Sequence, residues 1–580
     1  MNLYKSKRER YEVLRSQLYN ERSTFIPHWK ELSEYVSPRR SRFEISDVNK
    51  GDKRNHKIYD STATKALRTL ASGMMSGITS PARPWFRLTT SDPALAELGP
   101  VKGWLYLVTQ RMSAFFLKSN LYRALPLVYA DIGLYGTAGF GVEEDDKELL
   151  NAQVFPIGSY MIAKNTKGQV DVFIRDFRLT VRQLVEKFGV LNPKTGSPDW
   201  SNFSPTVKHS WDNSNYESWV DVCQVIEPNH FYDPRYMNSK YKKFSSCYYE
   251  RGKDMAGDVY LRESGYDYFP VLAPRWEVTG EDVYGTNCPG MTALPDIKML
   301  QTMQKRKAQA VEKMVNPPMT ATNDMRNTVN SVLPGDITYM QTGNSVFKPA
   351  YQVEPRINEL VLDIQDTRQS IQKDFYEDLF LMLATLDRRQ ITAREIDERH
   401  EEKLLALGPV LEQLNQDLLD PLIDIAFDTM VRTQRVPDPP PELQNQDLKV
   451  EYISIMAQSQ KLIGIAGIDH FTNFVSHVAA AVPTVLDKID TDQLIDIYGD
   501  MTSVPPGIIR PDKDVETLRQ SRAKQMQQQQ AAENMRQGAV AVKDLAGANT
   551  ESKNALTDLM QKAQRNQNAN ALGIQNSGLG

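Results

Sequence analysis

The sequence predicts an α+β protein, and three observations support that class. Helical spacing of apolar residues dominates residues 1–135 and returns from Leu294 onward. Between these segments, residues 141–280 alternate β-branched and aromatic residues with polar ones, which is typical of strands. The chain has 580 residues, more than one hydrophobic core usually organises, so several packed units are expected.

The amino-terminal segment predicts a series of helices. The first 35 residues are expected to form one charged amphipathic helix, whose apolar stripe is Tyr11, Leu14, Leu18 and Tyr19. After a polar, basic loop, Asp60 or Ser61 is a good N-cap for a second helix that ends near Pro81. Two further helices are expected at residues 101–118 and 121–135, the last closing at Gly136.

The central segment, residues 141–280, predicts mostly antiparallel strands separated by Pro, Asn and Gly turns. One helical insert is expected at LTVRQLVEKFG, residues 179–189. The preceding glycine-rich stretch GTAGFG, residues 136–141, follows a helix rather than a strand, and no helix opens after it. It is therefore interpreted as a helix-to-strand turn and not as a phosphate-binding loop.

Three long helices are predicted in the second half of the chain. The first covers residues 295–316, begins at Pro295 and is expected to pack Met303, Val311 and Met314 inward. A short excursion at residues 317–355 leads to a second helix, residues 356–386, with a largely acidic polar face. The third helix is expected to start at the capping box formed by Thr392 and Glu395, and to kink at Gly408-Pro409 and at Pro421.

The carboxyl-terminal part begins after a stiff Pro-rich linker, VPDPPPELQ, at residues 436–444. A new helical unit is expected from Leu448 to about Met501. The tail after Tyr498 contains no aromatic residue and favours helix, although it has little apolar surface to bury.

The composition excludes several classes of protein. The formal net charge is −4, so the chain lacks the basic excess that is typical of proteins that grip DNA phosphates. The three cysteines, Cys223, Cys247 and Cys288, are predicted to be buried free thiols because they form no C-x-x-C pair. No apolar run is long enough to span a membrane, and the amino terminus lacks a signal-peptide core, so a cytoplasmic, non-membrane protein is expected.

No catalytic motif is evident, and the chain is predicted not to be an enzyme and to need no cofactor or metal. The Walker A and G-x-S-x-G patterns are absent. The triplet His400-Glu401-Glu402 lacks the second His of a zinc-protease motif, and the histidines are scattered. Acidic pairs on helices are interpreted as solvated surface.

Two basic clusters remain as candidate contact sites for phosphate. Arg388 and Arg389 lie in a break between two long helices with acidic faces. The other cluster occupies the polar loop near residue 50, where it contacts either phosphate, an acidic partner or only solvent. Its members are Arg39, Arg40, Arg42, Lys50, Lys53, Arg54 and Lys57.

The order of these segments resembles the head-to-tail connector, or portal protein, of short-tailed bacteriophages. The resemblance is carried by stretches spread over most of the chain, and none of them is diagnostic alone. They are DSTATKALRTLASGMMSGITSPARPWFRL (60–88), LYGTAGFGVEE (134–144), YGTNCPGMTALPDIKMLQTM (284–303), KMVNPP (313–318), ITAREIDERHEEKLLALGPVLEQLNQDLLDPLI (391–423) and VETLRQSRAKQMQQQQ (515–530).

This resemblance implies a portal fold assembled as a dodecameric ring at one capsid vertex, through which double-stranded DNA is packaged and ejected. Its parts would be a wing (1–290), an outgoing stem helix (291–316), a small α/β clip (317–355), a returning stem helix (356–386), a channel loop (387–391), a kinked wing helix (392–435), the Pro-rich linker (436–447), a crown (448–514) and a helical barrel or tail (515–580). The implied partners are other copies of the chain, non-specific DNA, the major capsid and scaffolding proteins, the terminase and tail adaptor or tail tube proteins. The protein would be made in the host bacterial cytoplasm and reside in the virion.

Three sets of residues are predicted to serve this channel. An acidic stem face would repel DNA phosphates and so prevent DNA from binding to the wall of the bore. Its residues are Glu359, Asp363, Asp366, Asp374, Glu377 and Asp378. A few polar groups of the channel loop would touch DNA weakly; these are Arg388, Arg389 and Gln390. Basic residues of the first stem helix would bind the acidic stem or a neighbouring subunit; these are Lys305, Arg306, Lys307 and Lys313. The alternative is a helical scaffold or adaptor that binds only protein partners.

Overall fold

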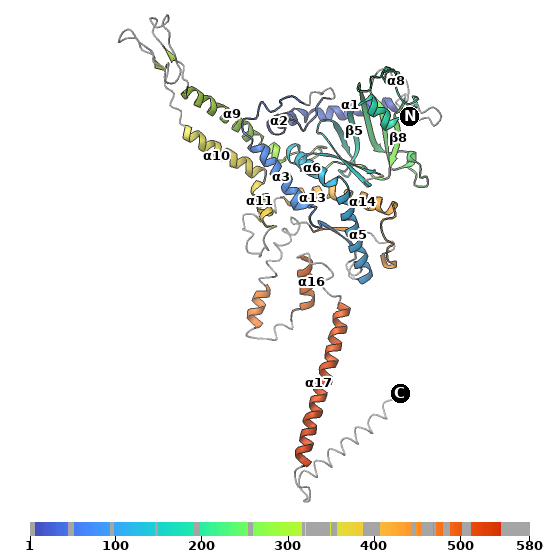
Figure 1. Ribbon diagram of the computed structural model, residues 1–580, viewed down its shortest axis with the longest axis vertical. Coiled ribbons are helices and arrows are strands. Elements are labelled where there is room, and N and C mark those ends of the chain that lie inside the picture. Colours follow the sequence, from blue (N-terminus) through green and yellow to red (C-terminus); the bar gives the residue numbers. More distant parts are fainter. Residues whose placement is uncertain are drawn as a thin grey trace. The chain divides into compact units, whose positions relative to one another are not determined.

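The computed structural model separates the chain into two compact units, Met1–Val504 and Pro505–Gly580 (Figure 1). It describes residues 6–44, 51–92, 95, 98–145, 149–190, 198–252, 259–315, 319–320, 348–349, 357–386, 407–443, 448–453, 468, 471–479, 488–501 and 512–546. Helices and antiparallel sheets are both present in the first unit, so the predicted α+β class is confirmed.

The amino-terminal helices follow the prediction except at the start. They are α1 (Lys7–Ser23), α2 (Ile26–Val36), α3 (Thr62–Ile78), α5 (Gly99–Lys118) and α6 (Leu121–Tyr135). The single helix expected over the first 35 residues is wrong, because Pro27 cannot continue α1 and instead occupies the first turn of α2. The stripe was also partly wrong, since the side chain of Tyr19 is 44% exposed. Helix α6 has the expected bounds and closes at Gly136, whose φ of 78° favours glycine.

The central segment forms two antiparallel sheets, as expected. One sheet has the order β3-β2-β9 and the other has the order β4-β5-β6-β7-β8. The strands are β2 (Gly139–Asp145), β3 (Leu149–Phe155), β4 (Tyr160–Lys164), β5 (Val170–Thr180), β6 (Trp219–Pro228), β7 (Phe244–Glu250), β8 (Arg262–Tyr266) and β9 (Val271–Leu272). The short elements beside them are α7 (Val181–Phe188), which is the expected helical insert, α8 (Pro205–Asp212) and the 3-10 turn η1 (Ser239–Tyr241).

The cysteines are buried and free, as predicted. Cys223 and Cys247 lie on the adjacent strands β6 and β7, where they pack with Tyr11 and Leu18 of α1. Helix α1 therefore covers one face of the five-stranded sheet with an apolar cluster.

The two long helices expected next are present with different ends. Helix α9 (Pro289–Val315) begins before Pro295, because Ala293, Leu294 and Ile297 are buried against the body and hold the turn around that proline helical. The second helix is broken into α10 (Ile357–Asp374) and α11 (Glu377–Leu386). The break is at Tyr376, whose φ of 54° is incompatible with a right-handed helix.

Around these helices lie segments that only partly fall within the described residues. Strands β10 (Met319–Thr320) and β11 (Lys348–Pro349) pair near the beginning and the end of the excursion at 317–355. The predicted capping box at Thr392 and Glu395 lies outside the described residues. The described part of the kinked helix consists of α13 (Gly408–Leu414), the π-helical turn η3 (Asn415–Leu419) and α14 (Asp420–Arg432).

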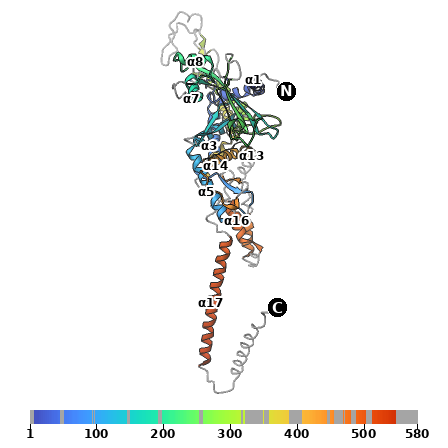
Figure 2. The same ribbon diagram turned by 90° about the vertical axis from the view of Figure 1, so that its right-hand side faces the viewer.

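The helical unit expected from Leu448 starts differently. After the 3-10 turn η4 (Pro441–Leu443), residues Leu448–Tyr452 form strand β12, which pairs with β1 (Phe86–Thr90). This pairing joins the segment after the Pro-rich linker to the body, and the first unit continues to Val504 through α16 (Thr491–Met501). The second unit contains α17 (Asp512–Ala546), one uninterrupted helix in Figure 2.

Candidate assembly and channel surfaces

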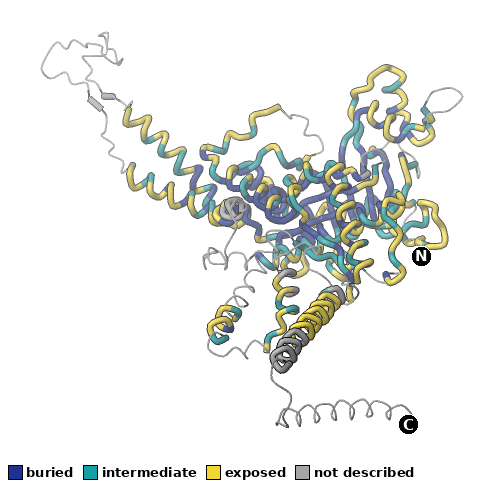
Figure 3. Tube along the Cα trace, turned by 60° about the horizontal axis from the view of Figure 1, so that its bottom comes forward, coloured by how far each residue is buried: buried dark blue, intermediate teal, exposed yellow. Residues whose placement is uncertain are grey.

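Helices α9 and α10 pack side by side, and only one end of the pair is buried (Figure 3). At that end Ile297 and Leu300 of α9 and Ile364 and Ile371 of α10 belong to the main hydrophobic core. Toward the other end, α9 is exposed over residues 311–315. The pair is thus a two-helix projection rooted in the body.

The apolar residues near the end of α9 are not covered by their own chain. Met303 is partly buried against the core, as expected. The predicted inward packing of Val311 and Met314 is wrong, since these side chains are 41% and 49% exposed, and Val315 is 81% exposed. With Gln304, Lys307, Ala308 and Glu312, Val311 and Val315 line a shallow depression along this helix.

A buried carboxylate, Asp60, ties the root of the projection to α3. It accepts hydrogen bonds from Thr62 N at 2.8 Å and from Gln304 Nε2 of α9 at 3.0 Å. Arg368 of α10 donates to it through Nε at 3.0 Å and Nη2 at 2.7 Å. Burial raises the pKa of Asp60, but the hydrogen bonds from Thr62 and Arg368 outweigh that effect and hold it below its ordinary value.

A neighbouring amide completes this junction. Gln301 of α9 is 3% exposed, and its Oε1 accepts from the backbone N–H groups of Tyr59, at 2.6 Å, and Asp60, at 2.8 Å. Its Nε2 donates to the Asp60 carbonyl at 3.0 Å. Sequence reasoning identified Asp60 only as an N-cap, because its partners lie more than 240 residues away.

The predicted basic residues all lie on α9. Lys305, Arg306 and Lys313 are exposed, and Lys307 is partly buried. The ammonium of Lys305 stands 5.8 Å from the ring centroid of Tyr59 in its own chain. Their role between subunits stays a prediction.

The predicted acidic residues divide into two groups. Glu359, Asp363 and Asp366 are exposed on α10, and Asp378 is exposed on α11. Asp374 and Glu377 are partly buried next to the helix break. Burial, and then the nearby Asp296, raises the pKa of Asp374. The exposed carboxylates of α10, Glu359, Asp363 and Asp366, therefore form an acidic surface on the projection, whereas Asp374, Glu377 and Asp378 lie at the helix break.

The remaining candidate cations are placed only in part. Arg388, Arg389 and Gln390 of the predicted channel loop lie outside the described residues, as do Lys50 and the triplet His400-Glu401-Glu402. In the basic loop, Arg40 forms an ion pair with buried Asp131, and Lys57 forms one with Glu34 at 2.5 Å. Arg39 donates to the Asp52 carbonyl at 3.3 Å. Arg40 and Lys57 thus serve the chain's own packing.

The helical run continues through Pro421, as predicted, and the π-helical turn η3 directly precedes α14, in which that proline lies; the kink itself stays a prediction. Asp417 within this turn binds Arg275, which is 3% exposed, through Nε at 2.9 Å and Nη2 at 3.0 Å. Gln413 also donates to Asp417 at 2.8 Å. A π turn adds a residue to the helix without ending it, so Asp417 can face the body while the proline's missing N–H is accommodated.

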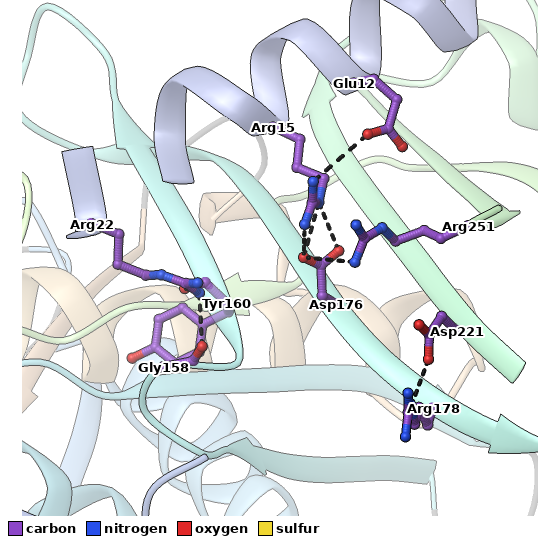
Figure 4. Close-up of polar contacts among 9 residues, drawn as sticks. All are labelled: Glu12, Arg15, Arg22, Gly158, Tyr160, Asp176, Arg178, Asp221 and Arg251. Atoms are coloured by element: carbon purple, nitrogen blue, oxygen red, sulfur yellow. Dashed lines mark hydrogen bonds and ion pairs between the residues drawn. The ribbon is translucent and has the colours of Figure 1, made fainter. Parts of the chain in front are cut away.

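Arginines of α1 fasten this helix to the five-stranded sheet (Figure 4). Arg15 donates to both carboxylate oxygens of Asp176 on β5, with Nη2 at 2.6 Å. Arg22 donates through Nη1 to the carbonyls of Gly158 and Tyr160, at 2.8 and 2.9 Å. The sequence predicted only a charged amphipathic helix and no role for these arginines, because their partners are distant in sequence.

Other site classes find no support in the described part of the chain. The stretch GTAGFG is buried and leads into β2, so the predicted helix-to-strand turn is confirmed. None of the described helices combines the length and apolar character needed to cross a bilayer. Among the described residues, no cluster of His, Cys, Asp or Glu has the arrangement of a metal site.

Helix α17 of the second unit is exposed along its described side chains. Residues 516–534 are all exposed, among them Met526 at 70%. The described side chains of this 35-residue helix therefore contribute little stability through packing within one chain.

Comparison with known proteins now identifies the family. The sequence matches the family described as bacteriophage head to tail connecting protein over residues 8–509. It is 47% identical over 560 residues to the portal protein of Salmonella phage epsilon15, covering 96% of this chain and 99% of that protein. It is 43% identical over 545 residues to the probable portal protein of Bordetella phage BPP-1, covering 94% and 96%.

A chain from the virion of a native gene transfer agent particle aligns at TM-score 0.33 and 9% identity, covering 76% of this chain and 94% of that one, a likeness that carries no weight here. The sequence matches are far stronger, and they confirm the resemblance inferred from the ordered stretches. This chain belongs to the family of bacteriophage head-to-tail connecting proteins.

Proposed function

We propose that this chain forms the portal of a phage head, a dodecameric ring at one capsid vertex through which double-stranded DNA is packaged and ejected. The observation that carries the proposal is the 47% and 43% identity to phage portal proteins over nearly the whole chain. The dodecameric symmetry and the DNA-conducting role follow from the family resemblance.

The two-helix projection is the proposed stem. Helix α9 leads outward to the clip at 317–355, which would dock the terminase during packaging and tail proteins afterwards, and α10 leads back. The loop at 387–391 would then face the bore, and Arg388 and Arg389 would make weak contacts with passing phosphates. The capsid protein would surround the wing, and the carboxyl-terminal helices would form the crown and barrel.

The exposed acidic residues of α10 support a conducting role. A conduit must pass DNA of any sequence without holding it, and each phosphate neutralised by Lys or Arg adds salt-dependent affinity. Glu359, Asp363 and Asp366 are exposed carboxylates on one helix of the projection. We place them toward the bore, where they repel the DNA backbone.

The uncovered apolar surfaces support assembly into a ring. Val311, Met314 and Val315 are exposed on α9 beside Lys305, Lys307 and Lys313. A neighbouring subunit would cover them, and its acidic α10 would complement the lysines. Such contacts between unlike surfaces of two copies form a ring when the rotation between subunits closes. Helix α17 would pack against copies of itself in the same way.

Ring formation is the first test. Mass measurement and negative-stain images of the purified chain should show rings with a central bore, and Val315→Asp should weaken them. The matched control is Val190→Asp, which changes a residue that is 68% exposed after α7. Only monomers under assembly conditions would overturn the proposal and favour a protein-binding scaffold or adaptor.

DNA contact is tested separately in rings that form normally. Arg388→Ala together with Arg389→Ala should impair packaging or DNA retention while leaving the rings intact. DNA retention equal to that of the unchanged chain would refute the assignment of this loop.

A further inference from the structure

The connection between β6 and β7, residues 229–243, carries a cluster of exposed apolar side chains that the proposed channel does not use. We call it the β6–β7 loop. Phe231 is 71% exposed, Tyr232 is 45%, Tyr236 is 54% and Met237 is 95% exposed. Single exposed apolar residues are ordinary on a protein surface, whereas four large ones within seven positions mark an interaction site.

Internal bonds hold the backbone of this loop in one shape. The Asn229 side-chain amide donates to the carbonyls of Lys240, at 2.7 Å, and Lys242, at 2.8 Å. The Asp233 N–H donates to the Tyr241 carbonyl at 3.1 Å. These hydrogen bonds join the first half of the loop to the second half, so the exposed side chains extend from a backbone of fixed conformation.

One packing contact lies within the loop, and a second brings the loop close to the sheet. The rings of Tyr236 and Tyr241 lie 4.9 Å apart. Gly265 of β8 lets the turn η1 approach closely, because a Cβ there would stand 2.2 Å from the Ser239 carbonyl oxygen. The chain thus orders an apolar surface that it does not bury itself, and such preorganisation lowers the entropic cost of binding.

The charged groups of the loop indicate what kind of partner fits. Arg235 is held by Asp233, with Nε at 3.0 Å and Nη2 at 2.7 Å from its two carboxylate oxygens. Lys242 is paired with Asp267 at 3.0 Å. Lys240 and Lys243 are exposed, and within the described part of the chain neither lies in an ion pair. The apolar centre therefore has a cationic margin.

We infer that the β6–β7 loop docks a different virion protein, through an apolar pocket on that protein bordered by carboxylates. Aromatic side chains, Met and Arg are the residues enriched at the centres of protein interfaces, and opposite charges at the rim guide docking. Nucleic acid fits less well as a partner. The guanidinium of Arg235 is already bound to the Asp233 carboxylate, and the exposed Phe231 and Met237 make no favourable contact with phosphates. A second copy of the same loop would oppose like charges.

A site-specific photo-cross-linker tests this inference in assembled phage particles. A benzophenone amino acid replaces Met237, and the control places it at Val190, which is also strongly exposed. The pairing of Thr180 with Trp219 puts the start of α7 at the opposite end of β6 from the loop, so the control samples another part of the surface. After irradiation, peptide mass spectrometry identifies the cross-linked segment.

The expected product joins position 237 to one other virion protein, at a peptide with Asp or Glu beside apolar residues. Phe231→Ser with Tyr232→Ser should reduce its yield about tenfold, and Lys240→Glu with Lys243→Glu should also reduce it without removing an apolar contact. Cross-links to DNA, to this chain or at the level of the Val190 control would overturn the inference. The docking surface does not depend on the channel, so normal rings without the cross-link would refute docking alone.

Discussion

The Asp60 carboxylate allows a quantitative prediction about the two-helix projection, because it joins α3, α9 and α10 in one cluster. Asp60→Ala removes the hydrogen bond that the carboxylate accepts from Thr62 N, the first N–H of α3, for which about 1 kcal/mol is expected. It also removes the charged bonds from Arg368, for which about 1 kcal/mol is expected after allowing for the 42% exposure of that side chain. The root of the projection should therefore be destabilised by about 2 kcal/mol.

Hydrogen–deuterium exchange of the purified protein measures this local loss of stability. An opening free energy lower by about 2 kcal/mol speeds exchange roughly 30-fold, since each 1.4 kcal/mol is a factor of ten. The acceleration should appear in peptides of α9 and α10 around Gln301 and Arg368 and should be absent from the five-stranded sheet. Asp60→Asn, which keeps an oxygen to cap Thr62 but loses the charge, should give an intermediate effect.

The matched control is Asp363→Asn, which neutralises an exposed carboxylate on the same helix as Arg368. Its effect should stay within about 0.5 kcal/mol. Exchange at the root that is unchanged in Asp60→Ala, or equal to that of the control, would refute the idea that this carboxylate anchors the two-helix projection.

Further expectations concern packing and pH. Gly73→Ala should lower the melting temperature, with a loss of about 1–3 kcal/mol, because the new Cβ would stand 2.2 Å from Cγ of buried Phe380. Gly103→Ala, in open space on α5, should instead raise the melting temperature, with a gain in stability of less than about 1 kcal/mol. A shift of the same sign in both variants would contradict the close packing of Gly73 against Phe380. Burial raises the pKa of Asp131 to about 6, with Arg40 only partly opposing it, so the folded chain binds the proton more tightly than the unfolded chain, whose pKa is near 3.8. The stability of the unchanged chain relative to Asp131→Asn should therefore increase by about 1 kcal/mol from pH 7 to pH 5, and denaturant unfolding that shows no such pH-dependent difference would contradict it.

Local signals in the sequence predicted much of the element content. Helix α6 has the predicted bounds because Gly136 ends it through a positive φ that other residues rarely adopt. The antiparallel region and the buried thiols followed from alternation and from cysteine spacing, which depend on neighbours along the chain. The family was recognisable because its ordered stretches extend over most of the chain.

The tertiary structure decided the features that depend on distant partners. The break at Tyr376 escaped prediction because the apolar stripe continues through it, although the backbone there leaves the helical region. The strand at 448–452 forms only because β1, more than 350 residues earlier, supplies the pairing edge. Arg15 and Asp60 acquired their roles in the same way, from carboxylate, amide and guanidinium partners that the fold brings to them.

The division has a physical cause. By itself the sequence determined what a few neighbouring residues decide: turn conformation, periodicity, and the class and family of the chain. Long-range packing decides which apolar residues are buried within one chain. Only the folded chain shows that Val311, Met314 and Val315 of α9 remain exposed.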